Sequence, residues 1–162
     1  MKIVLFDIDG VVADASDRFT TLYDGCHQPD WKPDWYRFHD ERMDIDPVIP
    51  GGAAMLRAAY YHMPSVAVGL ITNRLDKFRH RTRVWLANNA LPYDHLFMRG
   101  EHDYTNFKGH ILDNLLSQGC TILYGVDDDP LHREVYEKRG IPFVYFHSGY
   151  NELSHLIRER EA

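Results

Sequence analysis

The chain has 162 residues, of which 44% are hydrophobic and 26% charged, and it carries a formal net charge of −6. These values predict one globular domain spanning 1–162, and no apolar stretch reaches the ~20 residues that a membrane span needs. The chain starts with acidic residues where a signal peptide would continue apolar, and Cys26 lies far from Cys120, so we expect a cytoplasmic protein with reduced thiols. The negative charge disfavours the wrapping of long nucleic acid, although it leaves room for a local basic groove.

Apolar runs and amphipathic segments alternate along most of the sequence. In chain order, we expect a strand at 2–6, a helix at 51–61, a strand at 66–72, a helix at 77–89, a short strand at 95–98, a helix at 107–117, a strand at 121–126, a helix at 130–139, a strand at 142–146 and a helix at 151–160. Continuous apolar strands between amphipathic helices are typical of a parallel sheet covered on both faces. The pattern therefore predicts an α/β fold in three layers, with a doubly wound, Rossmann-like parallel sheet.

One segment, 14–50, does not fit this alternation. It is polar and aromatic, and it is too long to be a plain connection after the first strand, so we expect a small cap or binding insert. Its aromatic side chains could stack on a nucleic-acid base, but such residues more often pin an insert to the body of the domain. They are Trp31, Trp35, Tyr36 and Phe38.

Polar side chains stand at one end of the expected sheet. In a doubly wound sheet, ligands bind beyond the carboxyl ends of the strands, and four separate segments place chemically useful residues there. We expect these segments to converge on one pocket. The residues are Asp7, Asp9 and Gly10 after the first strand, Thr72, Asn73 and Arg74 after the second, Lys108 at the start of a helix, and Asp127, Asp128 and Asp129 after the strand at 121–126.

This set of residues indicates phosphate chemistry. Several carboxylates at one edge repel one another unless a positive charge lies among them. Mg²⁺ prefers oxygen ligands and keeps coordination positions for water and phosphate, and Lys108 would add a second positive charge. Thr72 offers a hydroxyl donor to phosphate oxygens. A carboxylate nucleophile beside a second carboxyl group that acts as acid and then base can divide phosphate hydrolysis into two steps.

Each feature also has a simpler interpretation. Asp and Gly are common in turns, so the residues after the first strand could form a plain turn, and Lys108 could be a solvated lysine. The acidic residues before Pro130 could cap a helix, which is the role we expect for Asp129. The four features together favour an enzyme over a catalytically idle binding module on the same fold.

A basic run follows the second expected strand. A solvated helix face and an oligonucleotide contact explain this run equally well. The run consists of Arg74, Lys77, Arg79, Arg81 and Arg83.

Four motifs resemble those of the haloacid dehalogenase superfamily, in the same order. They are DIDGVVAD at 7–14, LITNR at 70–74, Lys108 and VDDDP at 126–130. The resemblance implies a phosphatase in which Asp7 is the nucleophile that forms an aspartyl-phosphate and Asp9 is the acid and base. It also implies that the Asp9 backbone carbonyl binds Mg²⁺ together with Asp7, Asp127 and Asp128, and that Thr72 and Lys108 hold the phosphoryl group, with Asn73 beside them.

A narrower resemblance is to the 3′-phosphatase domain of bacteriophage polynucleotide kinase/phosphatase. It rests on Arg18, DWYRF at 34–38, DPVIPG at 46–51, ITNR at 71–74 and KFRHRTRVWL at 77–86. It implies that Arg18 and Arg74 serve the phosphate site and that the substrate is a nucleotide or a short single-stranded nucleic-acid end with a 3′-phosphate. No GxxxxGK[ST] motif for the kinase half occurs, and no obligate protein partner is evident. A 5′(3′)-deoxyribonucleotidase and a small-metabolite phosphatase are the alternatives.

Overall fold

The computed structural model describes residues 1–22, 25, 27–32, 34–40, 42–101 and 106–148. Its sheet has the strand order β3-β2-β1-β4-β5, and every neighbouring pair is parallel. The central strand β1 is buried on both sides, which explains its unbroken apolar run. The strands are β1 (Lys2–Phe6), β2 (Val66–Leu75), β3 (His95–Arg99), β4 (Thr121–Asp127) and β5 (Phe143–Tyr145).

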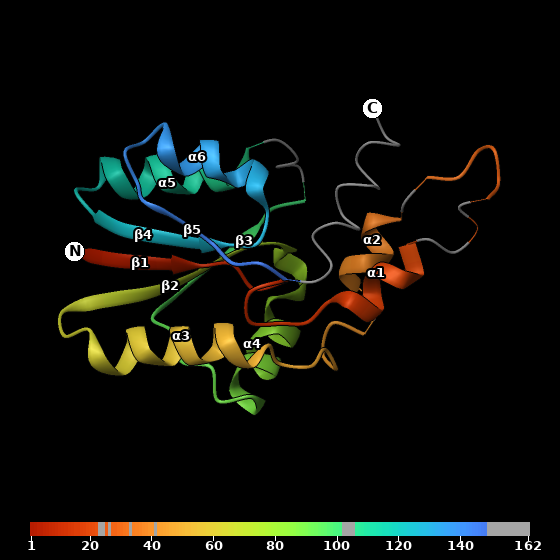
Figure 1. Ribbon diagram of the computed structural model, residues 1–162, viewed down its shortest axis with the longest axis horizontal. Coiled ribbons are helices and arrows are strands. Elements are labelled where there is room, and N and C mark those ends of the chain that lie inside the picture. The colour runs from red at the N-terminus through yellow and green to blue at the C-terminus, as the bar shows by residue number, and fades with distance from the viewer. Residues whose placement is uncertain (23–24, 26, 33, 41, 102–105, 149–162) are drawn as a thin grey trace.

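Helices cover both faces of this sheet (Figure 1). On one face lie α3 (Pro50–His62) and α4 (Arg79–Asn88), which pack Leu56 and Trp85 against the sheet. On the other face lie α5 (Phe107–Ser117) and α6 (Arg133–Glu137), which bring Leu112 and Tyr136 to the core. The predicted three-layer α/β fold with a parallel sheet is confirmed.

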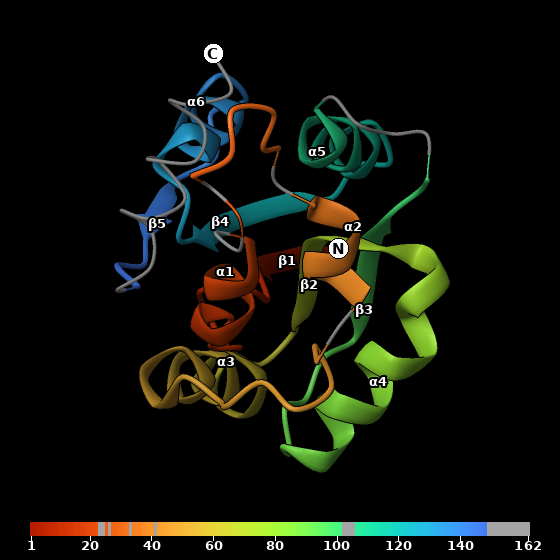
Figure 2. The ribbon, with the colours of Figure 1, turned by 90° about the vertical axis from the view of Figure 1, so that its right-hand side faces the viewer.

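The insert at 14–50 contains two short helices, α1 (Ser16–Leu22) and α2 (Trp35–Asp40), in front of the carboxyl ends of the strands (Figure 2). Ala15, Phe19, Leu22 and Phe38 form a small core of its own, and the Phe19 and Phe38 rings are 4.6 Å apart between centroids. Trp31 packs against this core, whereas Tyr36 is exposed. The Trp35 side chain lies outside the described part of the structure. Phe38 and Trp31 therefore serve packing within the insert.

The structure corrects several expected boundaries. Strand β2 continues through Leu75 because Leu75 still pairs with Arg99 of β3 after a register shift. The helices expected at 77–89 and 130–139 each begin with a 3₁₀ turn, η1 (Asp76–Phe78) and η2 (Pro130–His132). The Asp129 side chain accepts a hydrogen bond from Leu131 N at 2.9 Å, so it caps η2 as expected.

Two further expectations concern single segments. The helix expected at 151–160 lies outside the described residues. The helix expected at 107–117 is confirmed as α5, and its buried stripe is narrow: Leu112 and Leu115 are buried, whereas Leu116 is 37% exposed. Among the described residues, no helix has the length and apolar character needed to cross a bilayer.

Candidate active site

The loop after β1 is folded back on itself. Gly10 N donates to Ala13 O and Ala13 N donates to Ile8 O, both at 2.8 Å. Gly10 has a φ of +84°, a conformation that side chains with a Cβ rarely adopt, so a glycine suits this position. A Cβ on Gly52 would come within 1.7 Å of Val11 O, so this second glycine allows α3 to begin directly against the loop. Both glycines fix where the aspartates of the loop stand.

Asp7, Lys108 and Asp127 meet at the carboxyl end of the sheet. Lys108 comes from the first turn of α5 and is 2% exposed. Its Nζ lies 2.7 Å from Asp7 Oδ2 and 2.6 Å from Asp127 Oδ2. Asp7 Oδ1 accepts a hydrogen bond from Ile8 N at 2.7 Å. The interpretation of Lys108 as a solvated residue is therefore wrong, and residues from β1, α5 and β4 converge as the sequence predicts.

The acidic end of the site carries more negative charge than its neighbours balance. Burial raises the pKa of Asp7 to about 7, against the opposing effect of Lys108. Burial also raises the pKa of Asp128, and the charges of Asp7 and Asp127 raise it further. Burial would raise the pKa of Asp127 as well, but Lys108 and His132 outweigh it and hold that pKa below its usual value. Burial therefore opposes the charged forms of Asp7 and Asp128, whereas Asp127 is held in its charged form.

His132 is a member of this site that the sequence patterns did not single out. Its Nδ1 lies 3.0 Å from the Asp127 carboxylate and 3.4 Å from Lys108 Nζ. Among the described residues, Asp7, Asp127 and His132 form a set of atoms close enough to hold a metal ion. The ammonium group of Lys108 already contacts all three. The position of His132, two residues after the VDDDP motif, was the feature of the sequence that could have pointed to it.

The donor chemistry of these carboxylates fits Mg²⁺. Asp7 and Asp128 are buried carboxyl groups whose pKa values burial raises, and Mg²⁺, which prefers oxygen ligands, would stabilise their charged forms. Asp128 Oδ2 accepts a hydrogen bond from Ser148 Oγ at 3.1 Å, which orients the carboxylate. Asp127 is held by Lys108 and His132. Of the two aspartates in the turn, Asp128 is therefore the better candidate for a direct metal ligand.

Thr72 and Asn73 lie at the end of β2. Thr72 is buried, and its Oγ1 accepts a hydrogen bond from Arg74 N at 3.2 Å, so its own O–H remains a donor. Asn73 lines a pocket of about 320 Å³ together with Lys108. The other residues around this pocket are Asn106, Phe107, His132 and Val135.

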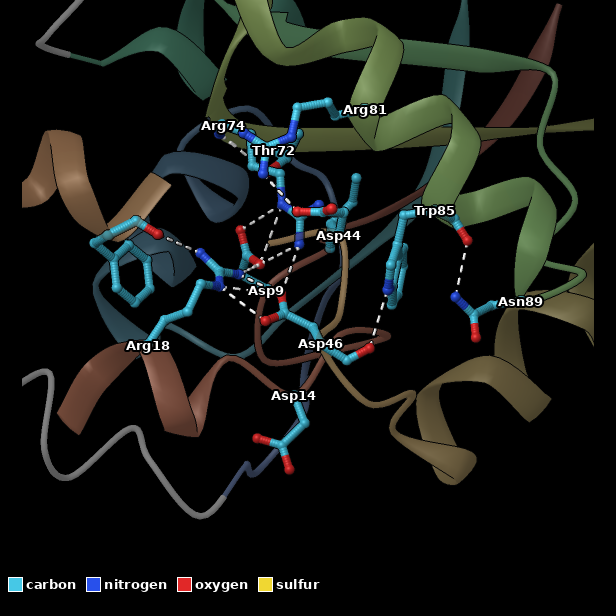
Figure 3. Close-up of polar contacts among 12 residues, drawn as sticks. Asp9, Asp14, Arg18, Asp44, Asp46, Thr72, Arg74, Arg81, Trp85 and Asn89 are labelled. Carbon is cyan, nitrogen blue, oxygen red and sulfur yellow. Dashed lines mark hydrogen bonds and ion pairs between the residues drawn. The ribbon is translucent and has the colours of Figure 1, made fainter. Parts of the chain in front are cut away.

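The Asp9 carboxylate lies between two arginines (Figure 3). Arg18 Nη2 is 2.5 Å and Arg74 Nη2 is 2.7 Å from Asp9 Oδ1, and Arg74 Nε is 3.0 Å from Oδ2. Burial alone would raise the pKa of Asp9, but Arg74 and Arg18 outweigh it and hold that pKa far below its usual value. Arg18 and Arg74, the two arginines that the sequence assigned to the phosphate site, thus lie together, and each contacts Asp9.

Asp46 completes this group. Arg18 Nε lies 2.9 Å from Asp46 Oδ1, and the Nη2 atoms of Arg18 and Arg74 lie 2.6 and 3.2 Å from Oδ2. Asp46 stands at the start of the DPVIPG stretch at 46–51, to which the sequence assigned no role. This stretch was the feature of the sequence that could have pointed to Asp46 as a member of the site.

The basic run on and before α4 is mostly paired. Arg79 forms an ion pair with Asp76 and donates to Leu96 O at 3.0 Å. Arg81 Nη2 lies 2.5 Å from Asp44 Oδ1, and Lys77 Nζ lies 3.3 Å from Glu101. Arg83 is exposed. Because these ion pairs lie within the domain, less of the basic run is left to contact a nucleic-acid backbone than the sequence alone indicates.

No protein-family model matches this chain, and no curated protein is significantly similar to it in sequence. Solved structures do match. A chain of a Pnkp1/Rnl/Hen1 complex superposes with a TM-score of 0.71 at 20% identity, covering 91% of this chain and 46% of the other. The present chain thus spans a little under half the length of that protein.

Two hydrolases match along nearly their whole length. A haloacid dehalogenase-like hydrolase from Streptococcus pneumoniae has a TM-score of 0.58 at 13% identity, covering 94% of this chain and 90% of that one. A haloacid dehalogenase-superfamily hydrolase from Geobacter sulfurreducens has a TM-score of 0.55 at 17% identity, with 97% and 96% covered. The chain therefore has the fold of the haloacid dehalogenase superfamily.

Proposed function

We propose that the chain is a Mg²⁺-dependent phosphomonoesterase that acts through an aspartyl-phosphate on Asp7. One observation carries the proposal: a carboxylate at the end of the central strand shares a buried lysine with a second carboxylate, and the neighbouring strand β2 carries a buried threonine near its end. A lysine so placed offsets the repulsion between an anionic nucleophile and an anionic substrate. The fold neighbours, which include several hydrolases, support the same class of chemistry.

In this proposal the side chains divide the work. An oxygen of Asp7 attacks phosphorus while the bond to the leaving oxygen breaks, and the protonated form of Asp9 gives that oxygen a proton. This role requires the bound phosphate to draw Arg18 or Arg74 away from Asp9, because both arginines hold its pKa low in this structure. Water then attacks the phosphorus of the aspartyl-phosphate while the bond from phosphorus to the Asp7 oxygen breaks. Asp9 takes up a proton from the attacking water, and inorganic phosphate and the free Asp7 carboxylate result. Thr72 and Lys108 bind phosphoryl oxygens during both steps.

Mg²⁺ would be held by Asp7, Asp128 and the backbone carbonyl of Asp9, with Asp127 in support. When bound, it supplies positive charge that draws phosphate oxygens to the nucleophile and offsets the negative charge of the site. Asp7 and Asp128 thereby stay ionised despite their burial.

We propose that the substrate is a nucleotide or a short single-stranded nucleic-acid end with a 3′-phosphate, and that the protein acts in the cytoplasm. A fold neighbour belongs to a complex described as an RNA repair complex, which supports a nucleic-acid end. The net charge of −6 and the paired state of Arg79 and Arg81 favour a short contact over a long one. A 5′(3′)-deoxyribonucleotidase and a small-metabolite phosphatase are the competing activities.

A panel of phosphate monoesters tests the proposal. It comprises an aryl phosphate, 3′- and 5′-nucleoside monophosphates, a sugar phosphate, and oligonucleotides phosphorylated at either end, each with Mg²⁺ and with a chelator. We expect hydrolysis only with Mg²⁺, with the highest kcat/KM on 3′-phosphate ends, and none with Asp7→Asn. Faster release from 5′-mononucleotides would favour the nucleotidase. No hydrolysis of any member would indicate an idle binding module.

A further inference from the structure

Four charged side chains from four segments form one group beside the proposed acid–base residue (Figure 3). Asp9 lies in the loop after β1, Arg18 in α1, Asp46 in the segment before α3, and Arg74 near the end of β2. The side chains of Arg18, Arg74 and Asp46 are at most 2% exposed, and that of Asp9 is 15% exposed. Two guanidinium groups thus meet two carboxylates, and the group is neutral as a whole.

The two arginines are engaged differently. Arg18 directs Nε and Nη2 to Asp46 and donates from Nη1 to Phe38 O at 2.7 Å, so most of its donors have partners within the insert. Arg74 directs Nε and Nη2 to Asp9, and among the described residues its buried Nη1 has no hydrogen-bond partner. Arg18 is therefore bound mainly to Asp46, and Arg74 mainly to Asp9.

Asp46 is itself fixed to the body of the domain. Its backbone oxygen accepts a hydrogen bond from Trp85 Nε1 at 3.0 Å. Trp85 is buried in α4, and the guanidinium carbon of Arg74 lies 5.6 Å from the centre of its ring. A rigid helix thus holds Asp46 while Asp46 holds Arg18.

We propose that Asp46 is a positioning residue for the acid–base group: it binds Arg18 and, with it and Arg74, holds the Asp9 carboxylate at the edge of the sheet. This inference rests on the proposed phosphomonoesterase function. Asp46 contacts neither substrate nor metal in this role. It supplies the second negative charge, so that the two arginines do not both depend on Asp9 for charge balance.

Removing the Asp46 charge has a specific expected consequence. In Asp46→Asn, two buried guanidinium groups share one carboxylate, so both draw on Asp9 and hold it away from the leaving oxygen. An alcohol leaving group needs the proton that Asp9 supplies, whereas an aryl leaving group departs with little assistance. The variant therefore loses activity on alkyl phosphates more than on aryl phosphates.

The experiment compares Asp46→Asn with Asp44→Asn, a matched control two residues away whose carboxylate pairs with the partly exposed Arg81. The ratio of kcat/KM for a nucleoside 3′-monophosphate to that for p-nitrophenyl phosphate is measured with Mg²⁺. We expect this ratio to fall by about tenfold or more in Asp46→Asn, against ~10²–10⁴ for complete loss of acid catalysis, while the control stays within about twofold of the parent.

A second variant keeps the test valid if Asp46→Asn fails to fold. Arg18→Gln combined with Asp46→Asn leaves one guanidinium, Arg74, and one carboxylate, Asp9, so its charge is balanced. We expect it to fold and its ratio to recover toward that of the parent, because only Arg74 then draws on Asp9. In Asp46→Asn, an equal loss on both substrates or a ratio matching that of Asp44→Asn would overturn the positioning role, as would a double variant that fails to fold or keeps a ratio at least tenfold below that of the parent. A parent protein without activity on any phosphate monoester would instead overturn the proposed function on which this role rests.

Discussion

The Nζ atom of Lys108 lies 2.7 Å from Oδ2 of Asp7, and both side chains are buried. The same Nζ is 2.6 Å from Asp127, so one ammonium group joins α5 to β1 and β4. Removing one partner of a buried ion pair leaves an uncompensated charge in a poorly solvated place. The stability of the fold therefore depends on the same ion pairs that form the proposed catalytic centre. Mutations can separate the effect on stability from the effect on activity.

Lys108→Met should abolish phosphatase activity and lower the free energy of unfolding by about 3–5 kcal/mol, because two buried carboxylates would then face each other without a cation. Urea unfolding without metal measures this. The matched control is Lys138→Met, since Lys138 forms an ion pair with Glu134 at 2.6 Å but both side chains are exposed. The control should change stability by less than about 1 kcal/mol. Equal effects of the two substitutions would contradict the buried position of Lys108.

Asp7→Asn should be inactive and yet more stable than the parent at pH 8. The pKa of Asp7 is about 7 in the folded protein against 3.8 for the ordinary group, so ionisation opposes folding. This penalty is absent below pH 3.8, grows as the pH rises, and is complete above pH 7. We expect a gain on the order of a few kcal/mol at pH 8 and a small one at pH 4.

Thermal unfolding of both proteins from pH 4 to pH 8, in the presence of a chelator, checks this difference. A variant that is less stable than the parent at pH 8 would show that the Lys108 contact outweighs the burial of Asp7. Residual turnover above a trace level would exclude Asp7 as the nucleophile.

Asp9→Asn should behave in the opposite way, because two arginines lower the pKa of Asp9. A lowered pKa contributes stability above the ordinary value of 3.8, and that stability is lost as the pH falls below it. The variant should therefore be less stable than the parent at pH 7. It should also hydrolyse alkyl phosphates far more slowly, and aryl phosphates only moderately more slowly. An unchanged ratio between the two substrates would argue against Asp9 as the acid.

The strands and the loop with Asp7 and Asp9 could be predicted because their signals are local. An unbroken apolar run reports a strand buried on both faces, and a glycine directly after it reports a turn. The short helices α1 and α2 have seven and six residues, too few for a clear helical period, and their own small core stabilises them. The continuation of β2 to Leu75 depends on its pairing with Arg99, which no local pattern contains.

The site divides in the same way. Its aspartates could be predicted from their place after strands, and Lys108 from its place at the start of the helix expected at 107–117. The roles of His132 and Asp46 depend on contacts between distant segments. A lysine in the first turn of a helix is usually solvated, and only the packing of α5 brings its ammonium group between two carboxylates. Asp46 lies 28 residues from Arg18 and 28 from Arg74, so no spacing rule joins them.

The contact with a nucleic-acid strand can be tested at Arg83, which is exposed on α4. Arg79 is a poorer candidate because it is tied to Asp76 and to the backbone of β3. Arg83→Ala should raise KM for a 3′-phosphorylated oligonucleotide and reduce the salt dependence of its binding by about one phosphate contact. Its effect on aryl phosphate hydrolysis should be much smaller, because that substrate has no strand to contact.

Arg79→Ala provides the comparison, since its loss removes contacts within the domain and should lower thermal stability more than it changes oligonucleotide binding. Binding is measured with the inactive Asp7→Asn background between 50 and 200 mM salt, a range over which phosphate contacts lose strength steeply. An unchanged salt dependence in Arg83→Ala, together with an unchanged KM for the oligonucleotide, would place the strand elsewhere on the molecule. In that case the preference for 3′-phosphate ends would have to come from the pocket that Asn73 and Lys108 line.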